Sequence, residues 1–308
     1  MSAAVQPAPF TPSESQLTVA YSVCRGITRT AAKNFYYAFL VLPKSKRRAL
    51  CAVYAFMRRC DDIVDDPTLA LQERRQKLVD WLDSVHRAMA GHPTDEPVLL
   101  ALTDAQRRFG IPLELLDGLA YGTARDLTLP AQPPEQEPLV SYRTFEDLRA
   151  YCYGVASVVG LVCIRIFGYR DPAAEPLAER CGLAFQLTNI IRDVKEDAAM
   201  GRVYLPEEDM AKFGITFDEL RTIPNAARFR PLLEMEADRA REYYQAGKQL
   251  IPLVDEDSQP GLWVLVTIYR KLLEKIAARQ YDVFSKKIAL TTGEKLLVLW
   301  KGLLKRLL

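Results

Sequence analysis

Apolar residues recur at intervals of three and four along most of the chain, which is the spacing that places them on one face of an α-helix. Proline and glycine interrupt this pattern and mark the ends of successive helices. The sequence shows no sustained alternation of apolar and polar residues, so no strand is expected. The pattern predicts an all-α protein with helices over residues 15–30, 33–41, 44–66, 70–91, 95–109, 112–127, 144–167, 173–200, 207–213, 228–253, 258–284 and 291–307.

Two proline-rich segments bear on the domain organisation. Residues 1–13 contain three prolines and are expected to form a flexible tail. Residues 129–141 contain four prolines and are expected to form a loop between two helices. This loop could be a domain boundary, but the two acidic segments described below lie on opposite sides of it and neither makes sense alone. We therefore predict one helical domain over residues 14–308, which is long for a single domain but within range.

The composition narrows the function classes. Apolar residues make up 49% of the chain and only 15 glycines occur, which favours a helical protein with a large core. The net charge is only +2, so no global field indicates a nucleic acid partner. Six scattered cysteines without a CxxC motif favour a reduced, cytoplasmic chain, and two histidines make a zinc site or a histidine-based triad a poor fit. Because no run reaches 18 apolar residues, no membrane-spanning helix is expected.

The first acidic segment, residues 61–66, ends one of the predicted helices. Asp61 and Asp65 are four residues apart and so lie one turn apart on one face. Like charges at this spacing destabilise a helix by roughly 0.2–0.5 kcal/mol per pair, so the pair indicates a bound cation. Cys51, Arg58 and Asp65 follow one another at steps of seven, and Tyr54 and Asp61 are also seven residues apart. Seven residues make nearly two helical turns, so a cation and apolar side chains are predicted on the same stripes as the carboxylates. The alternative is a solvated acidic cap at a helix end.

The second acidic segment lies in the helix predicted over residues 173–200. Gln186, Asn189, Asp193 and Asp197 follow one another at steps of three, four and four, so they form one stripe. Arg192 lies beside the acids, where a guanidinium could bind diphosphate oxygens in a bidentate manner. Oxygen ligands without histidine or cysteine predict Mg²⁺, with Mn²⁺ as a second option. The alternative is a surface helix stabilised by salt bridges.

A third segment, residues 151–160, is rich in small residues. Gly154, Ala156 and Gly160 leave space beside a helix, either for a second helix or for a flat apolar chain, and both interpretations stay open. Tyr151 begins this segment, and a phenol in an apolar cavity can orient a leaving group or stabilise a cation through its ring.

Taken together, these segments resemble the squalene/phytoene synthase family of head-to-head prenyl transferases. The resemblance runs from about residue 21 to residue 284. It rests on five motifs in the family order, at residues 34–39, 54–65, 151–153, 186–193 and 202–206.

The resemblance implies the isoprenoid synthase fold, with a central cavity between two aspartate-rich helices, Mg²⁺, and two prenyl diphosphates as substrates. The metal ligands that it implies are Asp61, Asp65, Asn189, Asp193 and Asp197. The cations that it implies for diphosphate binding are Lys33, Arg58, Arg192 and Arg202. The side chains that it implies around the reacting atoms are Tyr54, Tyr151, Gln186, Tyr204 and Tyr269. Asn34 stands where the family usually has serine, and its amide can still bind a phosphate oxygen.

The length of the prenyl chain is less well determined by the sequence. Farnesyl (C15) substrates lead to presqualene diphosphate, squalene or dehydrosqualene, and geranylgeranyl (C20) substrates lead to phytoene. Phe39 is bulky and favours a short chain, whereas Cys51 is small and favours room. The residues in the motifs resemble those of bacterial squalene-pathway members more closely, which favours the C15 pathway. A nucleotide-binding GxGxxG motif is not recognisable, so use of NADPH stays open.

Two other function classes deserve comparison. A terpene cyclase or chain-elongating prenyltransferase of the same fold would also use aspartate-rich helices, but residues 151–153 and 202–206 fit those enzymes poorly. An inactive family member acting as an assembly factor would lack an acidic or basic site residue, and here the main ones are present.

The last segment, residues 286–308, alternates basic residues with leucine, valine and Trp300. This pattern fits an amphipathic helix that lies on a membrane, which would make the protein peripheral to the bilayer. A helix that closes the core is the commoner explanation of such a pattern, and both interpretations stay open.

Overall fold

The computed structural model describes residues 10–124, 140–222 and 225–307, without the side chains of residues 33, 34, 306 and 307. Within these ranges the regular elements are helices, and extended pairing is limited to two isolated bridges, Val140 with Arg202 and Tyr169 with Val254. The all-α prediction is therefore confirmed. The helices group into two compact units, the first comprising residues 1–36 and 44–127 and the second residues 37–43 and 128–308. The main division falls at the start of the predicted proline-rich loop.

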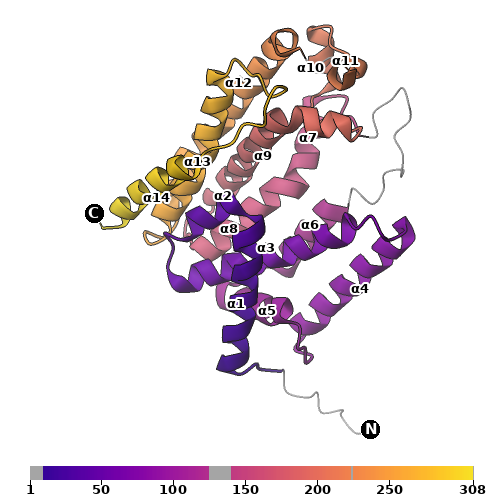
Figure 1. The fold of residues 1–308 in the computed structure, drawn as a ribbon. Coiled ribbons are helices and arrows are strands. Elements are labelled where there is room, and N and C mark those ends of the chain that lie inside the picture. Colours follow the sequence, from indigo (N-terminus) through magenta and orange to yellow (C-terminus); the bar gives the residue numbers. More distant parts are fainter. Residues whose placement is uncertain (1–9, 125–139, 223–224, 308) are drawn as a thin grey trace. The chain divides into compact units, whose positions relative to one another are not determined.

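The first unit is built around α3 (Figure 1). Its helices are α1 (Glu14–Ala31), the start of α2 (Lys33–Phe39), α3 (Lys44–Val64), α4 (Leu71–Met89), α5 (Pro97–Phe109) and α6 (Leu113–Ala124). α3 contacts α1, α4, α5 and α6. Leu50 and Phe56 of α3 are buried together with Leu102 of α5 and Leu116 of α6. A helix covered on this many sides holds its polar residues in fixed positions.

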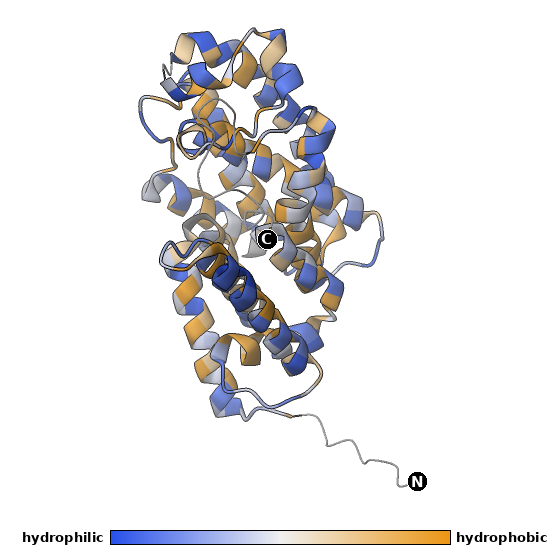
Figure 2. Ribbon diagram, turned by 90° about the vertical axis from the view of Figure 1, so that its right-hand side faces the viewer, coloured by the Kyte–Doolittle hydropathy of each residue, from blue (hydrophilic) through white to orange (hydrophobic). Residues whose placement is uncertain are grey.

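The second unit is built around α9, which contacts α7, α8, α11, α12 and α13. Its elements are α7 (Phe145–Cys152), the π-helical segment η2 (Tyr153–Ser157), α8 (Val158–Phe167), α9 (Ala174–Ala199), α10 (Glu207–Lys212), α11 (Phe217–Thr222), α12 (Ala226–Leu250), the 3₁₀ segment η3 (Ile251–Leu253), α13 (Gln259–Ala278) and α14 (Thr292–Leu307). Hydrophobic and hydrophilic residues are interspersed along the helices of both units, as expected for amphipathic helices (Figure 2).

The chain before the first helix is attached where the structure describes it. The backbone N–H of Phe10 donates to the carbonyl oxygen of Gly91 at 2.8 Å. Ser13 is the N-cap of α1, and its backbone N–H bonds the side chain of Gln16 at 2.9 Å in a capping box. The rest of the predicted tail, residues 1–9, lies outside the described residues.

The small residues of the third segment allow close helix packing. A Cβ atom at Gly160 would lie 2.6 Å from the carbonyl oxygen of Ala178, and one at Gly182 would lie 2.5 Å from that of Ala156. The space beside this segment is therefore filled by α9, and the interpretation as helix packing is confirmed. The stretch Phe145–Phe167 is long and apolar enough to cross a membrane by length and composition, although polar residues interrupt its apolar runs and no such helix was expected from the sequence. In the structure this stretch packs closely against α9.

Two of the predicted helices differ in the structure from the sequence-based expectation. The helix predicted over residues 144–167 contains the π-helical turn η2, which periodicity does not reveal. The helix predicted over residues 258–284 ends at Ala278, because Gln280 and Tyr281 have φ angles of 54° and 61°. These angles lie in the left-handed region and cannot continue a right-handed helix.

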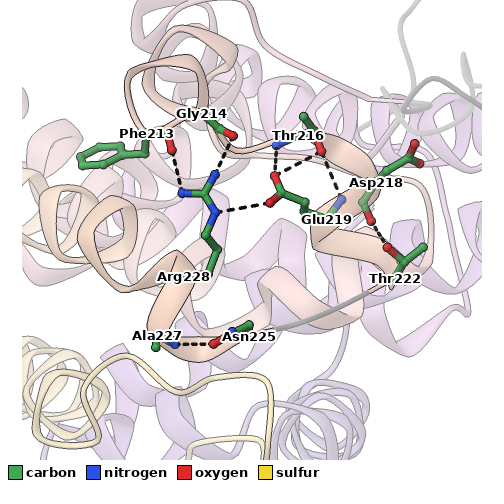
Figure 3. Close-up of polar contacts among 9 residues, drawn as sticks. All are labelled: Phe213, Gly214, Thr216, Asp218, Glu219, Thr222, Asn225, Ala227 and Arg228. Atoms are coloured by element: carbon green, nitrogen blue, oxygen red, sulfur yellow. Dashed lines mark hydrogen bonds and ion pairs between the residues drawn. The ribbon is translucent and has the colours of Figure 1, made fainter.

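The short helix α11 is absent from the prediction. Thr216 and Glu219 form a capping box at its start, with the backbone N–H of Thr216 bonded to the carboxylate of Glu219 at 2.9 Å. Figure 3 shows Arg228 of α12 donating to the carbonyl oxygens of Phe213 and Gly214 at 2.8 and 2.6 Å and to the Glu219 carboxylate at 3.3 Å. One arginine thus ties the turn before α11, and α11 itself, to the start of α12.

Candidate active site

The first acidic stripe lies at the end of α3, as predicted. The backbone N–H of Asp65 bonds the carbonyl oxygen of Asp61 at 2.8 Å, so the helical register continues past Val64 and holds the two carboxylates one turn apart. Asp61 is half-buried, and it accepts a hydrogen bond of 3.2 Å from the Thr123 hydroxyl of α6. Burial raises the pKa of Asp61 to about 6, although this hydrogen bond and Arg58 oppose the shift. A bound cation would remove most of the cost of charging this carboxyl group.

Arg58 and Tyr54 lie close to this stripe. The Arg58 guanidinium pairs with Asp62 at 2.6 Å. The sequence pattern had instead grouped Arg58 with Asp65, seven residues further along. Burial raises the pKa of Tyr54, while the charge of Arg58 lowers it and those of Asp61 and Asp62 raise it. The cation, the phenol and the carboxylates therefore share one end of α3.

The two residues used to predict chain length lie inside the cores. Cys51 is buried where α3 meets α1, and its carbonyl oxygen accepts a hydrogen bond of 3.3 Å from Thr28. Burial raises the pKa of the Cys51 thiol. Phe39 is buried in the second unit. Because Cys51 packs against α1, close helix packing explains its small size as well as room for a substrate would.

The second acidic stripe lies on α9 and includes an unsatisfied amide. The Asn189 side-chain oxygen is buried and has no hydrogen-bond partner. A buried acceptor left in this state costs about 1–3 kcal/mol, so it marks a place for a donor or a cation. Asp193 and Asp197 follow on the same face, one and two turns further along.

Asp193 and Asp197 have opposite electrostatic surroundings. Burial acts to raise the pKa of Asp193, but hydrogen bonds from Arg192 and Lys287 outweigh it and hold that pKa below its usual range. The Arg192 Nε lies 2.8 Å from one carboxylate oxygen and its Nη2 contacts the other, while the Lys287 Nζ lies at 3.1 Å. Burial and the charge of Asp193 raise the pKa of Asp197 to about 7, with Arg202 opposing the shift. The stripe thus contains one acid whose charged form is favoured, Asp193, and one whose neutral form is favoured by burial, Asp197.

Lys287 is a site residue that the sequence analysis did not find. It was grouped with the basic residues of the last segment, but α14 begins only at Thr292, and Lys287 contacts Asp193 and Glu196 of α9 instead. The Lys195 ammonium also donates to the carbonyl oxygen of Phe284 at 2.7 Å. The segment after α13 is therefore tied to the acidic stripe.

Three tyrosines form an aromatic cluster in the second unit. Tyr151 and Tyr204, both predicted, stack with ring centroids 5.2 Å apart. Tyr142, which was not predicted, lies 5.3 Å from Tyr151 and 6.1 Å from Tyr204. Its carbonyl oxygen accepts a 2.9 Å hydrogen bond from the backbone N–H of Glu207, so Tyr142 is attached to the chain that carries Tyr204.

The remaining predicted residues of the second unit also lie along α9 or its neighbours. Tyr269 of α13 is buried and stacks on Phe185 with centroids 4.4 Å apart. Its charge interaction with Arg192 indicates that the two are close. Gln186 is half-buried one position after Phe185. Lys33 and Asn34 begin α2, and their side chains lie outside the described part of the structure.

The oxygen-rich stripes fit a divalent cation that is shared with a substrate. Among the described residues, no group of three or more His, Cys, Asp and Glu side chains is arranged to hold a metal. The unsatisfied Asn189 oxygen and the two aspartates after it instead offer a partial set of hard oxygen donors. Mg²⁺ is commonly bound by one or two carboxylates together with substrate phosphates, which is the arrangement that such a partial set suits.

Comparison with known proteins defines the class to which this fold and these stripes correspond. Residues 28–294 match the squalene/phytoene synthase family. The chain is 35% identical to a 15-cis-phytoene synthase of Synechococcus elongatus, over 95% of this chain and 96% of that protein. It is also 35% identical to a phytoene synthase of Mycobacterium tuberculosis, over 91% of this chain and 89% of that protein.

Solved structures agree with this class. A dehydrosqualene synthase in complex with a ligand matches with a TM-score of 0.81 and 30% identity, over 94% of this chain and 96% of that chain. A squalene synthase of Alicyclobacillus acidocaldarius matches with a TM-score of 0.75 and 29% identity, over 88% of this chain and 97% of that chain. The fold is thus that of the isoprenoid synthases, and the protein is a prenyltransferase. The chain belongs to the squalene/phytoene synthase family, whose members condense prenyl diphosphates head to head and generally depend on divalent metals.

Proposed function

We propose that this protein condenses two molecules of geranylgeranyl diphosphate to phytoene with the help of Mg²⁺. The observation that carries the proposal is the stripe on α9, where a buried amide oxygen without a partner lies beside two aspartates and two cations. The C20 substrate is supported by curated relatives named phytoene synthase, which match at 34–35% identity over 91–95% of this chain. These names favour the C20 alternative over the C15 pathway that the residues of the motifs suggested.

The two acidic stripes have corresponding roles in this proposal. Asp61 and Asp65 would hold metal at one stripe, and Asn189, Asp193 and Asp197 at the other. The bound Mg²⁺ would supply positive charge that stabilises the departing diphosphate. The burial that raises the pKa values of Asp61 and Asp197 supports these roles, because a cation restores the charged form of such a carboxyl group.

The cations next to Asp193 would bind the diphosphate. Arg192 and Lys287 now neutralise Asp193, and both present donors that match phosphate oxygens. We expect them to turn toward the diphosphate when Asp193 takes up its metal. Arg202 would act beside Asp197, where its positive charge opposes the rise that burial causes in the pKa of this carboxyl group.

The aromatic cluster would protect and steer the allylic cation. The rings of Tyr151 and Tyr204 offer negative faces, and both residues are buried. Burial also excludes water, which would otherwise capture the cation. The double bond of the second substrate would attack this cation, and loss of a proton would close the ring of a cyclopropylcarbinyl diphosphate. A second loss of diphosphate, rearrangement of the resulting cation and loss of a second proton would give phytoene. Tyr151 would assist proton loss or diphosphate departure.

The proposal is tested by incubating the purified protein with labelled geranylgeranyl diphosphate and Mg²⁺, without a second co-substrate. We expect a hydrocarbon with twice the carbon count of the substrate, formed without NADPH and lost when a chelator is added. A matched incubation with farnesyl diphosphate tests the second candidate, squalene-type coupling, which the squalene and dehydrosqualene synthase neighbours favour. Coupled product from farnesyl diphosphate alone would overturn the C20 assignment, and no coupled product from either would overturn the proposal.

A further inference from the structure

One face of the last helix, α14, exposes a continuous set of large apolar side chains. Trp300 is 58% exposed, more than any other large apolar residue in the described part of the second unit. Four leucines on the same helix are 38–50% exposed. Their spacings of three, four and seven place all five on one face, which we call the apolar stripe: Leu296, Leu297, Trp300, Leu303 and Leu304.

The opposite face of α14 is packed firmly on α13. Val298 is buried, and a Cβ atom at Gly302 would lie 2.2 Å from a methyl carbon of Val264. The Lys275 ammonium bonds the Glu294 carboxylate at 2.7 Å near the start of the helix. The interpretation of this segment as a helix that closes the core is therefore confirmed for one face of α14. α14 closes the core with one face, and it leaves an apolar stripe on the other.

Basic residues accompany the apolar stripe. Lys301 and Lys305 are exposed, and the Lys305 ammonium lies 5.2 Å from the centre of the Trp263 ring. The sequence of α14 contains four Lys and Arg residues and one acidic residue, so the helix carries a net charge of about +3. Two copies of this helix would repel each other if they met along their stripes, whereas a negatively charged surface would attract each one.

We propose that α14 docks the protein on the surface of an anionic lipid bilayer. The apolar stripe would enter the boundary between headgroups and acyl chains, and the flanking lysines would contact the anionic headgroups. Trp300 suits this boundary, because an indole ring combines an apolar body with one polar N–H group. The inference rests on the exposure and charge of α14 and holds whichever prenyl chain the enzyme uses.

Sedimentation of the full-length protein with lipid vesicles tests this proposal. We expect co-sedimentation with vesicles of phosphatidylcholine and phosphatidylglycerol, and much less with phosphatidylcholine alone or at high salt. The double variant Leu297→Ser/Trp300→Ser should bind roughly tenfold more weakly, because it removes two side chains from the stripe. The matched control is Val19→Ser/Val79→Ser, which removes two side chains of the first unit that are 61% and 51% exposed and should bind as the wild type does.

A second measurement separates insertion from simple charge attraction. Lipids with brominated acyl chains should quench Trp300 fluorescence, and Trp300→Phe, which still binds, should show correspondingly less quenching. Circular dichroism melting confirms that each variant is folded. Equal sedimentation of the stripe variant and the control, or no binding to anionic vesicles by the wild type, would overturn the proposal. So would a concentration-dependent dimer that the stripe variant loses, because the stripe would then pair with a second copy.

Discussion

Asp197→Asn should stabilise the metal-free protein while it reduces catalysis. Burial raises the pKa of Asp197 from 3.8 to about 7, so the folded protein favours the neutral acid. The pH dependence follows from the linkage between protonation and folding. Well below pH 3.8 the carboxyl group is protonated in both the folded and the unfolded protein, so the raised pKa does not reduce stability. The loss of stability grows as the pH rises to about 7. Asparagine resembles the neutral acid in shape and has no charge to bury, so the variant avoids this cost.

The size of the effect follows from the shift. The difference between about 7 and 3.8 corresponds to about 4 kcal/mol at most. Asp197 is only half-buried, so solvent screening reduces this to about 1–2 kcal/mol. For a chain of 308 residues such a gain raises the melting temperature by about 2–3 °C.

Thermal unfolding in the presence of a chelator checks this prediction. At about pH 8 the variant should melt above the wild type, and the difference should shrink at about pH 5, where most wild-type Asp197 is protonated. Exposed Asp83→Asn is the control and should leave the melting temperature unchanged. Added Mg²⁺ with a non-reactive diphosphate should stabilise the wild type more than the variant. A variant that melts at or below the wild-type temperature at about pH 8 would refute the reasoning.

Three further predictions concern the site and its support. Asp61→Asn should abolish measurable condensation while the far-ultraviolet circular dichroism spectrum stays that of a helical protein; substantial remaining turnover would exclude Asp61 as an essential metal ligand. Tyr142→Ala should lower kcat roughly tenfold, because the rings of Tyr151 and Tyr204 lose their shared neighbour, and Tyr142→Phe should restore most of it; an Ala variant with unchanged kcat would show that the cluster does not need this ring. Gly182→Val should lower the melting temperature through a loss of about 3 kcal/mol or more, because even a Cβ atom would lie 2.5 Å from a backbone oxygen; an unchanged melting temperature would contradict the close contact.

The local parts of the fold could be predicted from the sequence. Most long helices were found because their apolar residues repeat with the helical period and their ends carry proline, glycine or capping residues. The two acidic stripes were found for the same reason, since spacing along one helix fixes which side chains share a face. The short helix α11 was missed because six residues are too few for a periodic pattern, although the capping residues Thr216 and Glu219 gave a signal.

The parts of the site that depend on distant contacts could not be predicted. Lys287 lies near α9 because its segment is held there by the hydrogen bond from Lys195 to the carbonyl oxygen of Phe284, and these two residues are 89 positions apart in the sequence. Thr123 reaches Asp61 from a different helix, 62 positions away. Tyr142 has no neighbouring motif and acquires its place only when its segment pairs with the chain near Arg202. Such contacts come from tertiary packing, and the periodicity of residues along one helix gives no information about them.

The most direct measurement for the central claim is mass analysis of the hydrocarbon formed from geranylgeranyl diphosphate and Mg²⁺ by the wild type and by Asp193→Asn. If the carboxylate stripes hold the metal and the diphosphate, the wild type should give phytoene and the variant should give no coupled product while it remains folded. Phytoene formed by the variant at the wild-type rate, or a wild type that releases only uncoupled C20 products, would contradict the account.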